Sequence, residues 1–447
     1  MDNQVSTIPA FFKNAPLLRV LLLGFLLLLL QIPIDMVQGL TSEREARRDQ
    51  AVEEVTAKWG KEQSLIGPVI VVPYVRRIEE SRNGEKKVHT TPYHAYFLPE
   101  ELVVDGQIHS EVRQRGIFEV PVYRASLVMK GRFSRPLFSD WDINPDDVAW
   151  DRAQLFVRIS DVRAIQNMAA LQWNGNELPF LPGTGDFGGG SPGIHASLKD
   201  HVRDEQFTFS LPFELNGSMG IFFAPSGRNT TVNLQANWSD PSFQGNWLPS
   251  NRTVTPKGFH ATWTIPALGH NFPRRWTSES GLVKVDTAPQ FGVTLVSLVD
   301  HYRMAQRSIK YEHLFLVLTF LSLWLFEVLV KIRIHPLQYV LVGAGMCLFY
   351  LLELSLAEHL GFIAAYVIAS AAVVGLITTY CVAVVQTVSR AAIIGAVVTA
   401  LYGYLYVLLL NEDYALLVGS IGLFLTLAMV MYLTRKVDWY GAPETVP

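Results

Sequence analysis

The segment HLFLVLTFLSLWLFEVLV at residues 313–330 opens a nearly continuous apolar stretch that runs to about residue 433. A bilayer core of roughly 30 Å needs about 20 apolar residues in each spanning helix. Short polar hinges divide the stretch into pieces of that length. We therefore predict five transmembrane helices, at about 313–330, 337–356, 362–385, 391–410 and 414–433.

The hinges between these helices alternate in charge. Positive residues follow the first, third and fifth helices, namely Lys331, Arg333, Arg390, Arg435 and Lys436. The hinges after the second and fourth helices, at Glu358-His359 and Glu412-Asp413, contain no Lys or Arg. Because positive residues in short loops favour the cytoplasmic side, this alternation predicts a cytoplasmic C-terminus and an extracytoplasmic segment before residue 311.

A leucine-rich run at 17–34 predicts a sixth transmembrane helix. No small-residue cleavage site follows it, so we interpret it as an uncleaved anchor. The Arg residues after the run outnumber the basic residues before it, but long domains cross the membrane largely regardless of charge. The expected organisation is a cytoplasmic N-terminus at 1–16, the anchor at 17–34, a periplasmic domain at 35–310, a helical block at 311–433 and a cytoplasmic tail at 434–447.

The segment 35–310 has the pattern of a β-rich domain. Short runs of apolar and β-branched residues alternate with Gly, Pro, Asn and Asp, which is typical of an antiparallel sandwich or barrel. Strands are expected at about 68–73, 88–98, 102–108, 117–132, 153–160, 207–213, 220–224, 231–236, 259–264 and 291–297. We predict a sandwich-like or barrel-like fold, with two submodules divided near the glycine-rich loop at 181–193.

Three local features are expected in or beside this domain. Ser42 and Glu45 have the spacing of a capping box, which predicts a separate short helix at 42–58. The pair Asp105-Gly106 favours a type I′ hairpin turn. A helical turn is expected at about 162–170.

Sequence motifs for catalysis, cofactors and metals are not convincing. The pattern G-x-G-x-x-G at 183–188 follows a proline and precedes more glycines and a proline, so no helix can start there to hold a dinucleotide. Ser218 misses the hydrolase motif by one position, and no H-E-x-x-H occurs. We predict no catalytic residues, no cofactor and no metal site, and the net charge of −3 gives no reason to expect a nucleic-acid partner.

Ionisable residues inside the membrane are costly and are therefore candidate functional residues. Glu353 lies within the second helix of the block, and Glu358 and His359 lie at its rim. One interpretation is a proton or cation relay, and the other is a structural hydrogen bond to a neighbouring helix. Glu327 stands four residues before Lys331, so an intrahelical pair suffices to explain it.

Small residues recur at every fourth position of two neighbouring helices, and such stripes let helix backbones approach closely. The first stripe is Ala371, Gly375, Thr379 and Ala383, and the second is Ala391, Gly395, Thr399 and Gly403. We expect these two helices to pack together, although a homo-oligomer contact would use the same residues.

Several strings in fixed order resemble the CreD family of bacterial inner-membrane proteins. They are RGIFEVPVY at 115–123, WSDPSFQG at 238–245, GFHATW at 258–263, RSIKY at 307–311, HPLQY at 335–339 and LFYLL at 348–352. The resemblance covers nearly the whole chain except for the length and glycine content of the loop at 181–193. It implies an envelope protein associated with integrity and stress, commonly linked to a two-component system, and it supplies no catalytic residue or ligand.

The leading hypothesis is a non-enzymatic inner-membrane protein that supports cell-envelope integrity, with the bilayer, envelope proteins or peptidoglycan as partners. One alternative is a transporter or channel component that uses Glu353. A third is a protein that acts on envelope glycan or lipid, because exposed tryptophans stack on sugars, although core packing explains most of the tryptophans.

Overall fold

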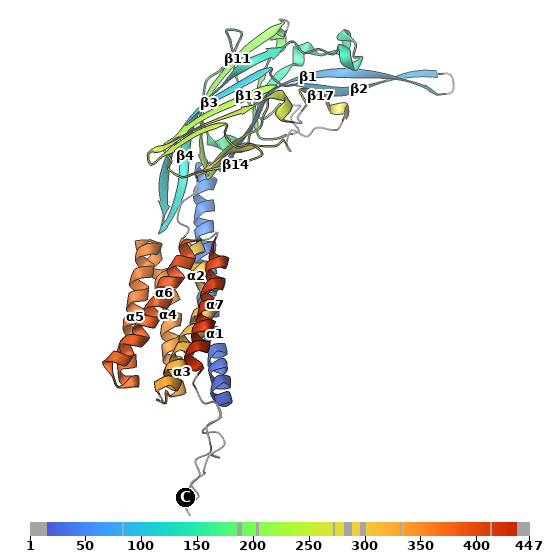
Figure 1. The fold of residues 1–447 in the computed structure, drawn as a ribbon. Coiled ribbons are helices and arrows are strands. Elements are labelled where there is room, and N and C mark those ends of the chain that lie inside the picture. The colour runs from blue at the N-terminus through green and yellow to red at the C-terminus, as the bar shows by residue number, and fades with distance from the viewer. Residues whose placement is uncertain are drawn as a thin grey trace, which may run out of the picture. The chain divides into compact units, whose positions relative to one another are not determined.

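A computed structural model describes residues 16–82, 85–185, 190–202, 205–270, 273–280, 288–295, 301–330, 332–411 and 414–435. Its internal contacts divide the chain into two units (Figure 1). The membrane unit combines residues 1–48 with residues 299–447, and the β-rich unit is residues 49–298.

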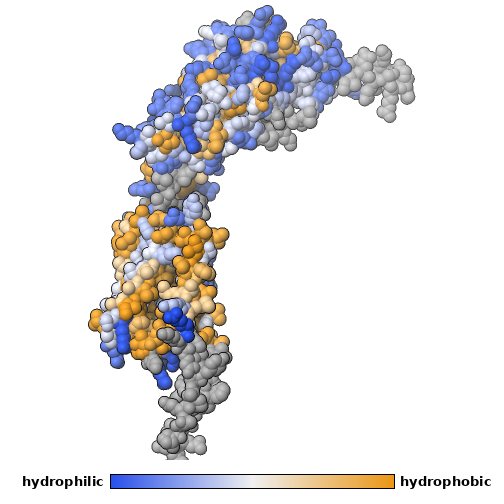
Figure 2. Space-filling view, in the orientation of Figure 1, coloured by the Kyte–Doolittle hydropathy of each residue, from blue (hydrophilic) through white to orange (hydrophobic). Residues whose placement is uncertain are grey.

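The described residues contain six helices that are long and apolar enough to cross a bilayer. They are α1 (Pro16–Trp59), α3 (Glu312–Val330), α4 (Pro336–Leu360), α5 (Phe362–Val385), α6 (Val388–Leu410) and α7 (Ala415–Thr434). A short amphipathic helix, α2 (His301–Lys310), precedes α3. Apolar side chains dominate the visible surface of the spanning helices (Figure 2). The prediction of a six-helix membrane protein is confirmed, while Lys331, Glu412, Asp413 and Lys436 lie outside the described residues.

Helix α1 continues without a break from the apolar anchor to Trp59. The prediction of a separate helix at 42–58 is therefore wrong. Ser42 does not cap a new helix, because its hydroxyl donates to the carbonyl oxygen of Gln38, 3.1 Å away and one turn earlier. Thr41 makes the same kind of bond to Val37. Such bonds to a preceding carbonyl let Ser and Thr sit inside a helix.

The β-rich unit consists of two mixed sheets. Sheet A runs in the order β14-β18-β12-β1-β5-β10-β9, with β2 on β1 and β17 on β2, and sheet B runs in the order β15-β16-β13-β3-β4-β11-β7-β8, with β6 on β11. The strands of sheet A are β1 (Gln63–Arg82), β2 (Glu85–Phe97), β5 (Gln154–Ile159), β9 (Leu181–Pro182), β10 (Gly193–Ser197), β12 (Gly220–Phe223), β14 (Pro241–Gly245), β17 (Arg275–Thr277) and β18 (Phe291–Leu295). Those of sheet B are β3 (Glu101–Arg115), β4 (Phe118–Ser134), β6 (Ile165–Met168), β7 (Leu171–Trp173), β8 (Asn176–Leu178), β11 (Gln206–Ser218), β13 (Asn229–Ala236), β15 (Asn251–Thr255) and β16 (Gly258–Ile265).

One hydrophobic core lies between the two sheets. Side chains alternate between inside and outside along β3, where Leu102, Val104 and Ile108 are buried. Large aromatic residues from both sheets fill the centre, including the fully buried Trp263 of sheet B and Phe291 of sheet A, whose ring centroids are 5.8 Å apart. Neither sheet closes on itself, so the unit is an open, sandwich-like β structure. The predicted β-rich domain is confirmed.

The predicted turn at Asp105-Gly106 is wrong, because both residues lie inside β3. A Cβ on Gly106 would come within 2.7 Å of the side chains of Leu127 and Leu234, so this glycine serves close packing. The chain reverses instead beside Gly116, whose φ of 63° favours glycine. The expected helical turn at 162–170 is limited to the single 3₁₀ turn Val162–Ala164, after which β6 begins.

The glycine-rich loop at 181–193 joins β9 to β10, which pair as neighbours in sheet A. The Thr184 hydroxyl donates to the Ser191 carbonyl oxygen, 3.0 Å away, and closes the described part of the loop. Residues 186–189 lie outside the described residues. Strands from before and after the loop are mixed in both sheets.

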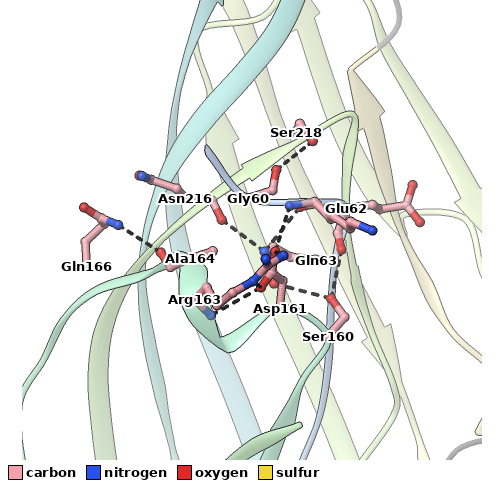
Figure 3. A network of polar contacts seen from close by, with 11 residues as sticks. Gly60, Glu62, Gln63, Ser160, Asp161, Arg163, Ala164, Gln166, Asn216 and Ser218 are labelled. Carbon is pink, nitrogen blue, oxygen red and sulfur yellow. Dashed lines mark hydrogen bonds and ion pairs between the residues drawn. The ribbon is translucent and has the colours of Figure 1, made fainter. Parts of the chain in front are cut away.

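A buried polar network joins the end of α1 to the sheets of its unit (Figure 3). The Gln63 side-chain amide donates to the carbonyl oxygens of Lys61 and Asn216, each 3.2 Å away. The Ser218 hydroxyl donates to the Gly60 carbonyl oxygen at 2.8 Å. These bonds tie the segment between α1 and β1 to β11 of the opposite sheet.

Two further contacts complete this junction. The Trp59 ring N–H, at the last residue of α1, donates to the Tyr123 carbonyl oxygen on β4 at 3.1 Å. The Asp161 carboxylate accepts from the Lys61 backbone N–H and pairs with Arg163 through two bonds of 2.9 and 3.0 Å. The bond to Arg163 is the main reason that the pKa of Asp161 lies below its usual value.

We expect Asp161→Asn to lower the free energy of unfolding of the β-rich unit by about 1 kcal/mol near pH 7, since Arg163 is largely solvent-exposed and the pair is screened. The folded-state pKa is depressed, so the carboxylate stabilises the fold above its ordinary pKa. That stabilisation is lost as the pH falls through the depressed value. Tryptophan-fluorescence melts of the full chain should show a difference that shrinks on acidification. The exposed Asp146→Asn is the control, and an equal effect of both variants would contradict the role of the pair.

Candidate functional site

Glu353 on α4 is buried in the membrane unit, and its side chain contacts helix α2. Its Oε2 atom accepts a hydrogen bond from the Ser308 hydroxyl of α2 at 2.8 Å. Its Oε1 atom is buried and has no hydrogen-bond partner among the described residues. The residue is 1% exposed. A structural hydrogen bond to a neighbouring helix therefore accounts for one carboxyl oxygen of Glu353. It does not account for the other oxygen.

Glu358 and His359 do not join Glu353 in one site. Glu358 accepts a bond from the Tyr302 hydroxyl of α2 at 2.9 Å and lies 3.8 Å from Arg44 of α1. Burial, followed by the bond to Glu358, raises the pKa of Tyr302 well above its usual value. His359 is exposed. Tyr302, near the start of α2, thus contacts Glu358 near the end of α4, and Ser308, near the end of α2, contacts Glu353 more than one turn earlier. Helix α2 therefore lies antiparallel to α4.

Polar contacts hold α2 to two more helices of the membrane unit. The Gln306 side chain donates to Glu45 of α1 at 2.5 Å. The Arg307 guanidinium donates to the Leu408 carbonyl oxygen of α6 at 3.5 Å. Helix α2 also carries the buried apolar residues Tyr302, Ala305 and Ile309. It is a short amphipathic helix fastened to the bundle by side chains, and we call it the clasp helix.

Two further acids are buried in the described part of the membrane unit. Glu327 of α3 pairs with Arg19 of α1 at 2.5 Å and accepts from the Tyr339 hydroxyl of α4 at 3.1 Å. Both of these partners are on other helices, and the intrahelical pair expected with Lys331 involves a residue outside the described residues. Glu312, at the start of α3, is fully buried, and neither of its carboxyl oxygens is hydrogen-bonded to a residue that the structure describes.

The two stripes of small residues lie in different surroundings. Ala371, Gly375, Thr379 and Ala383 are exposed on the face of α5 that points away from its packed residues. On α6, Ala391 and Gly395 are buried, whereas Thr399 and Gly403 are exposed. A Cβ on Gly395 would come within 2.4 Å of the Thr378 hydroxyl of α5, while nothing lies within 4 Å at Gly375. Only Gly395 clearly serves the packing of α5 on α6.

The β-rich unit has a groove of about 520 Å³ on sheet B. Amide, hydroxyl and acidic side chains line it, including Gln107, Ser126, Asn167, Glu214 and Gln235. Asp105 also lies there, but Lys130 at 2.6 Å and Asn233 at 2.9 Å occupy its carboxylate. Trp173 and Trp263 are fully buried in the core and offer no ring to a sugar, whereas Trp238 and Trp247 are only partly buried against it.

The chain is similar to known inner-membrane proteins over nearly its whole length. The family profile described as "Inner membrane protein CreD" matches residues 15–440. The inner membrane protein CreD of Escherichia coli strain K12 is 33% identical over 439 residues, which cover 97% of this chain and 94% of that protein. The chain belongs to the CreD family. The match of residues 15–440 spans both units.

Two of the solved structures that resemble part of this CreD-family chain are M1 zinc metallopeptidases. The M1 zinc metallopeptidase from Deinococcus radiodurans aligns with a TM-score of 0.20 and 11% identity over 38% of this chain and 40% of that chain. A two-domain M1 zinc metallopeptidase mutant bound to L-arginine aligns with a TM-score of 0.19 and 10% identity, over 38% and 40% of the two chains. Likeness at this level carries no argument about the CreD-family fold or its activity.

We expect Gly395→Ala to destabilise the membrane unit by about 1–3 kcal/mol, because the new methyl group overlaps the Thr378 side chain. The matched control is Gly375→Ala on α5, where the methyl group meets open space and alanine is the better helix former in water. Thermal unfolding of the detergent-solubilised full chain compares the two. Equal melting temperatures for both variants would show that α5 and α6 do not pack through Gly395.

Proposed function

We propose that this CreD-family protein is a non-enzymatic inner-membrane protein that supports cell-envelope integrity. In this proposal it joins bilayer-embedded helices to a β-rich domain on the periplasmic side. The supporting observation is α1, a single helix that begins in the apolar anchor and ends at Trp59 in the polar junction of the β-rich unit. A helix of this kind carries force along its axis, because each of its turns is hydrogen-bonded to the next.

The alternating hinge charges support the topology of this proposal. Six spanning helices return the chain to its starting side, so both termini are cytoplasmic and the insertion between the first two spans, α1 and α3, is periplasmic. The bilayer is then the first partner of the protein. Envelope proteins or peptidoglycan are the partners that we expect for the β-rich unit, and the exposed face of α5 leaves room for a homo-oligomer.

Two observations favour a non-enzymatic role over the alternatives. Ser218, the residue nearest to a hydrolase motif, is fully buried and bonded to the Gly60 carbonyl oxygen. Two small cavities of the membrane unit, of about 10 and 30 Å³, are lined mostly by apolar side chains such as Leu323 and Ile394. Neither cavity includes Glu353, so the geometry does not favour a conduit through that residue.

The topology is tested by fusing two reporters to the full chain within the loop at 181–193, one active only in the cytoplasm and one only in the periplasm. We expect only the periplasmic reporter to be active there, because the hinge charges place residues 35–310 outside the cytoplasm. Fusions at the C-terminus are the control and should show the opposite pattern. Activity of the cytoplasmic reporter at the loop would contradict the proposed topology.

The role of α1 is tested by inserting a flexible Gly-Ser segment after Arg48, between the apolar part of α1 and its junction. In cells that lack their own CreD-family protein, we expect the full chain to restore exclusion of a membrane-impermeant dye and the insertion variant to fail. Failure is expected because a flexible segment interrupts the continuous helix α1 that connects the two units. The same insertion at residues 186–189 is the control. Full activity of the α1 insertion, at equal abundance, would refute the linkage role.

A further inference from the structure

The buried acids of the membrane unit differ sharply in their partners. Among the described residues, Glu312, Glu327 and Glu353 are the acidic side chains with exposures below 5%. Glu327 has the Arg19 guanidinium at 2.5 Å and the Tyr339 hydroxyl at 3.1 Å. It is therefore a paired acid, because the positive charge of Arg19 and the Tyr339 hydroxyl stabilise its ionised carboxylate.

Glu353 has no such counter-charge. Within the described residues its hydrogen-bond partner is the neutral Ser308 hydroxyl. The titratable groups that face it are phenols, namely Tyr350 on its own helix, Tyr366 on α5 and Tyr402 on α6. The Tyr366 hydroxyl donates to the Tyr402 carbonyl oxygen at 2.6 Å and is committed to that bond.

The nearest cationic side chain on the clasp helix does not neutralise Glu353. Arg307 precedes Ser308, but its guanidinium is directed to the Leu408 carbonyl oxygen on α6. No ion pair joins Glu353 to an Arg, Lys or His in the described parts of the chain. The Oε1 atom of the carboxyl group is left without a hydrogen bond in the same region.

Glu312, four residues after Ser308, is a second buried acid without a cationic hydrogen-bond partner among the described residues. The groups that face it are Asp35 of α1, which is another acid, and Cys347 and Tyr350 of α4. The His313 ring nitrogen lies 3.1 Å from Oε2, but without hydrogen-bond geometry, and that ring is 65% exposed to solvent. Both carboxyl oxygens of Glu312 are buried and unbonded to the described residues.

Electrostatics decides the protonation state of such groups. Moving an ionised carboxylate from water into an apolar medium without a partner is strongly unfavourable, and a group in that position takes up a proton instead. The neutral acid has an O–H donor and two acceptor oxygens, so it tolerates a single bond from a serine. A sodium ion is a poor alternative, because Glu353 and Ser308 together offer too few oxygen ligands.

We propose that Glu312 and Glu353 are proton-binding sites and that both are loaded in this conformation. The ligand at each site is one proton, carried on a carboxyl oxygen. At Glu353 the neutral acid receives the Ser308 bond that fastens the clasp helix to α4. The inference depends on the placement of these helices in the bilayer and on neither the envelope role nor a transport role.

Infrared spectroscopy of the full chain in lipid vesicles tests the proposal, because it reads the carboxyl group and not envelope function. At pH 7 we expect a C=O stretch of protonated carboxylic acid that shifts to lower frequency in D₂O. The intensity of this band should fall by about half in Glu353→Gln and in Glu312→Gln and should vanish in the double variant. The matched control is Glu327→Gln, which removes the paired acid and should leave the band unchanged.

Other outcomes would overturn the proposal. A spectrum without the band at pH 7, or a band whose intensity is undiminished in the double variant, means that the two acids are ionised. Loss of the band on addition of sodium ions at constant pH means that a cation replaces the proton. Ser308→Ala keeps both acids and guards against misfolding of the Gln variants. It should raise the C=O frequency of Glu353 by removing its hydrogen bond, and an unchanged frequency would refute the contact.

Discussion

The architecture of the membrane unit depends on one constraint, namely that polar groups in a bilayer have no water to bond with. The backbone meets this requirement by forming helices, and the side chains meet it in three ways. Serine and threonine donate to carbonyl oxygens one turn earlier, as Thr379 does to Gly375 and Thr399 to Gly395. Glu327 finds a cation on another helix. Among the described residues, Glu353 is hydrogen-bonded to a serine and paired with no charged group, so its proton is part of the proposed structure.

Helix α1 belongs to both units and gives each of them a different kind of contact. Before Arg48 it packs apolar residues such as Leu26, Leu30 and Ile34 among the helices of the bundle. After that residue it contributes polar and aromatic groups, among them Trp59, over which the Arg113 guanidinium lies at 3.6 Å. The change from apolar to polar partners along a single helix explains why its sequence reads as two separate elements.

Much of the fold could be predicted from local patterns, because apolar length and β-branched runs act over short distances. The limits of the spanning helices α3 and α5 were predicted to within one residue. Asp105-Gly106 misled the prediction, because the glycine is required by Leu127 and Leu234, which are distant in sequence. The candidate site was half predicted. Glu353 stands out inside an apolar run. Glu312 lies just before the predicted helix at 313–330, and the sequence does not mark it as buried, because the groups that face it come from α1 and α4.

The order of strands in the sheets has a consequence for the synthesis of the protein. In sheet A, β1 pairs in parallel with β12, and β12 pairs with β18, which is the last strand of the unit in the sequence. In sheet B, β3 pairs in parallel with β13, more than a hundred residues later. Neither sheet can be completed from a nascent chain that ends before these late strands. Pairing between distant strands is slow, and unfinished edges aggregate. An N-terminal helix that is already inserted keeps the unfinished domain at the membrane until its last strand is synthesised.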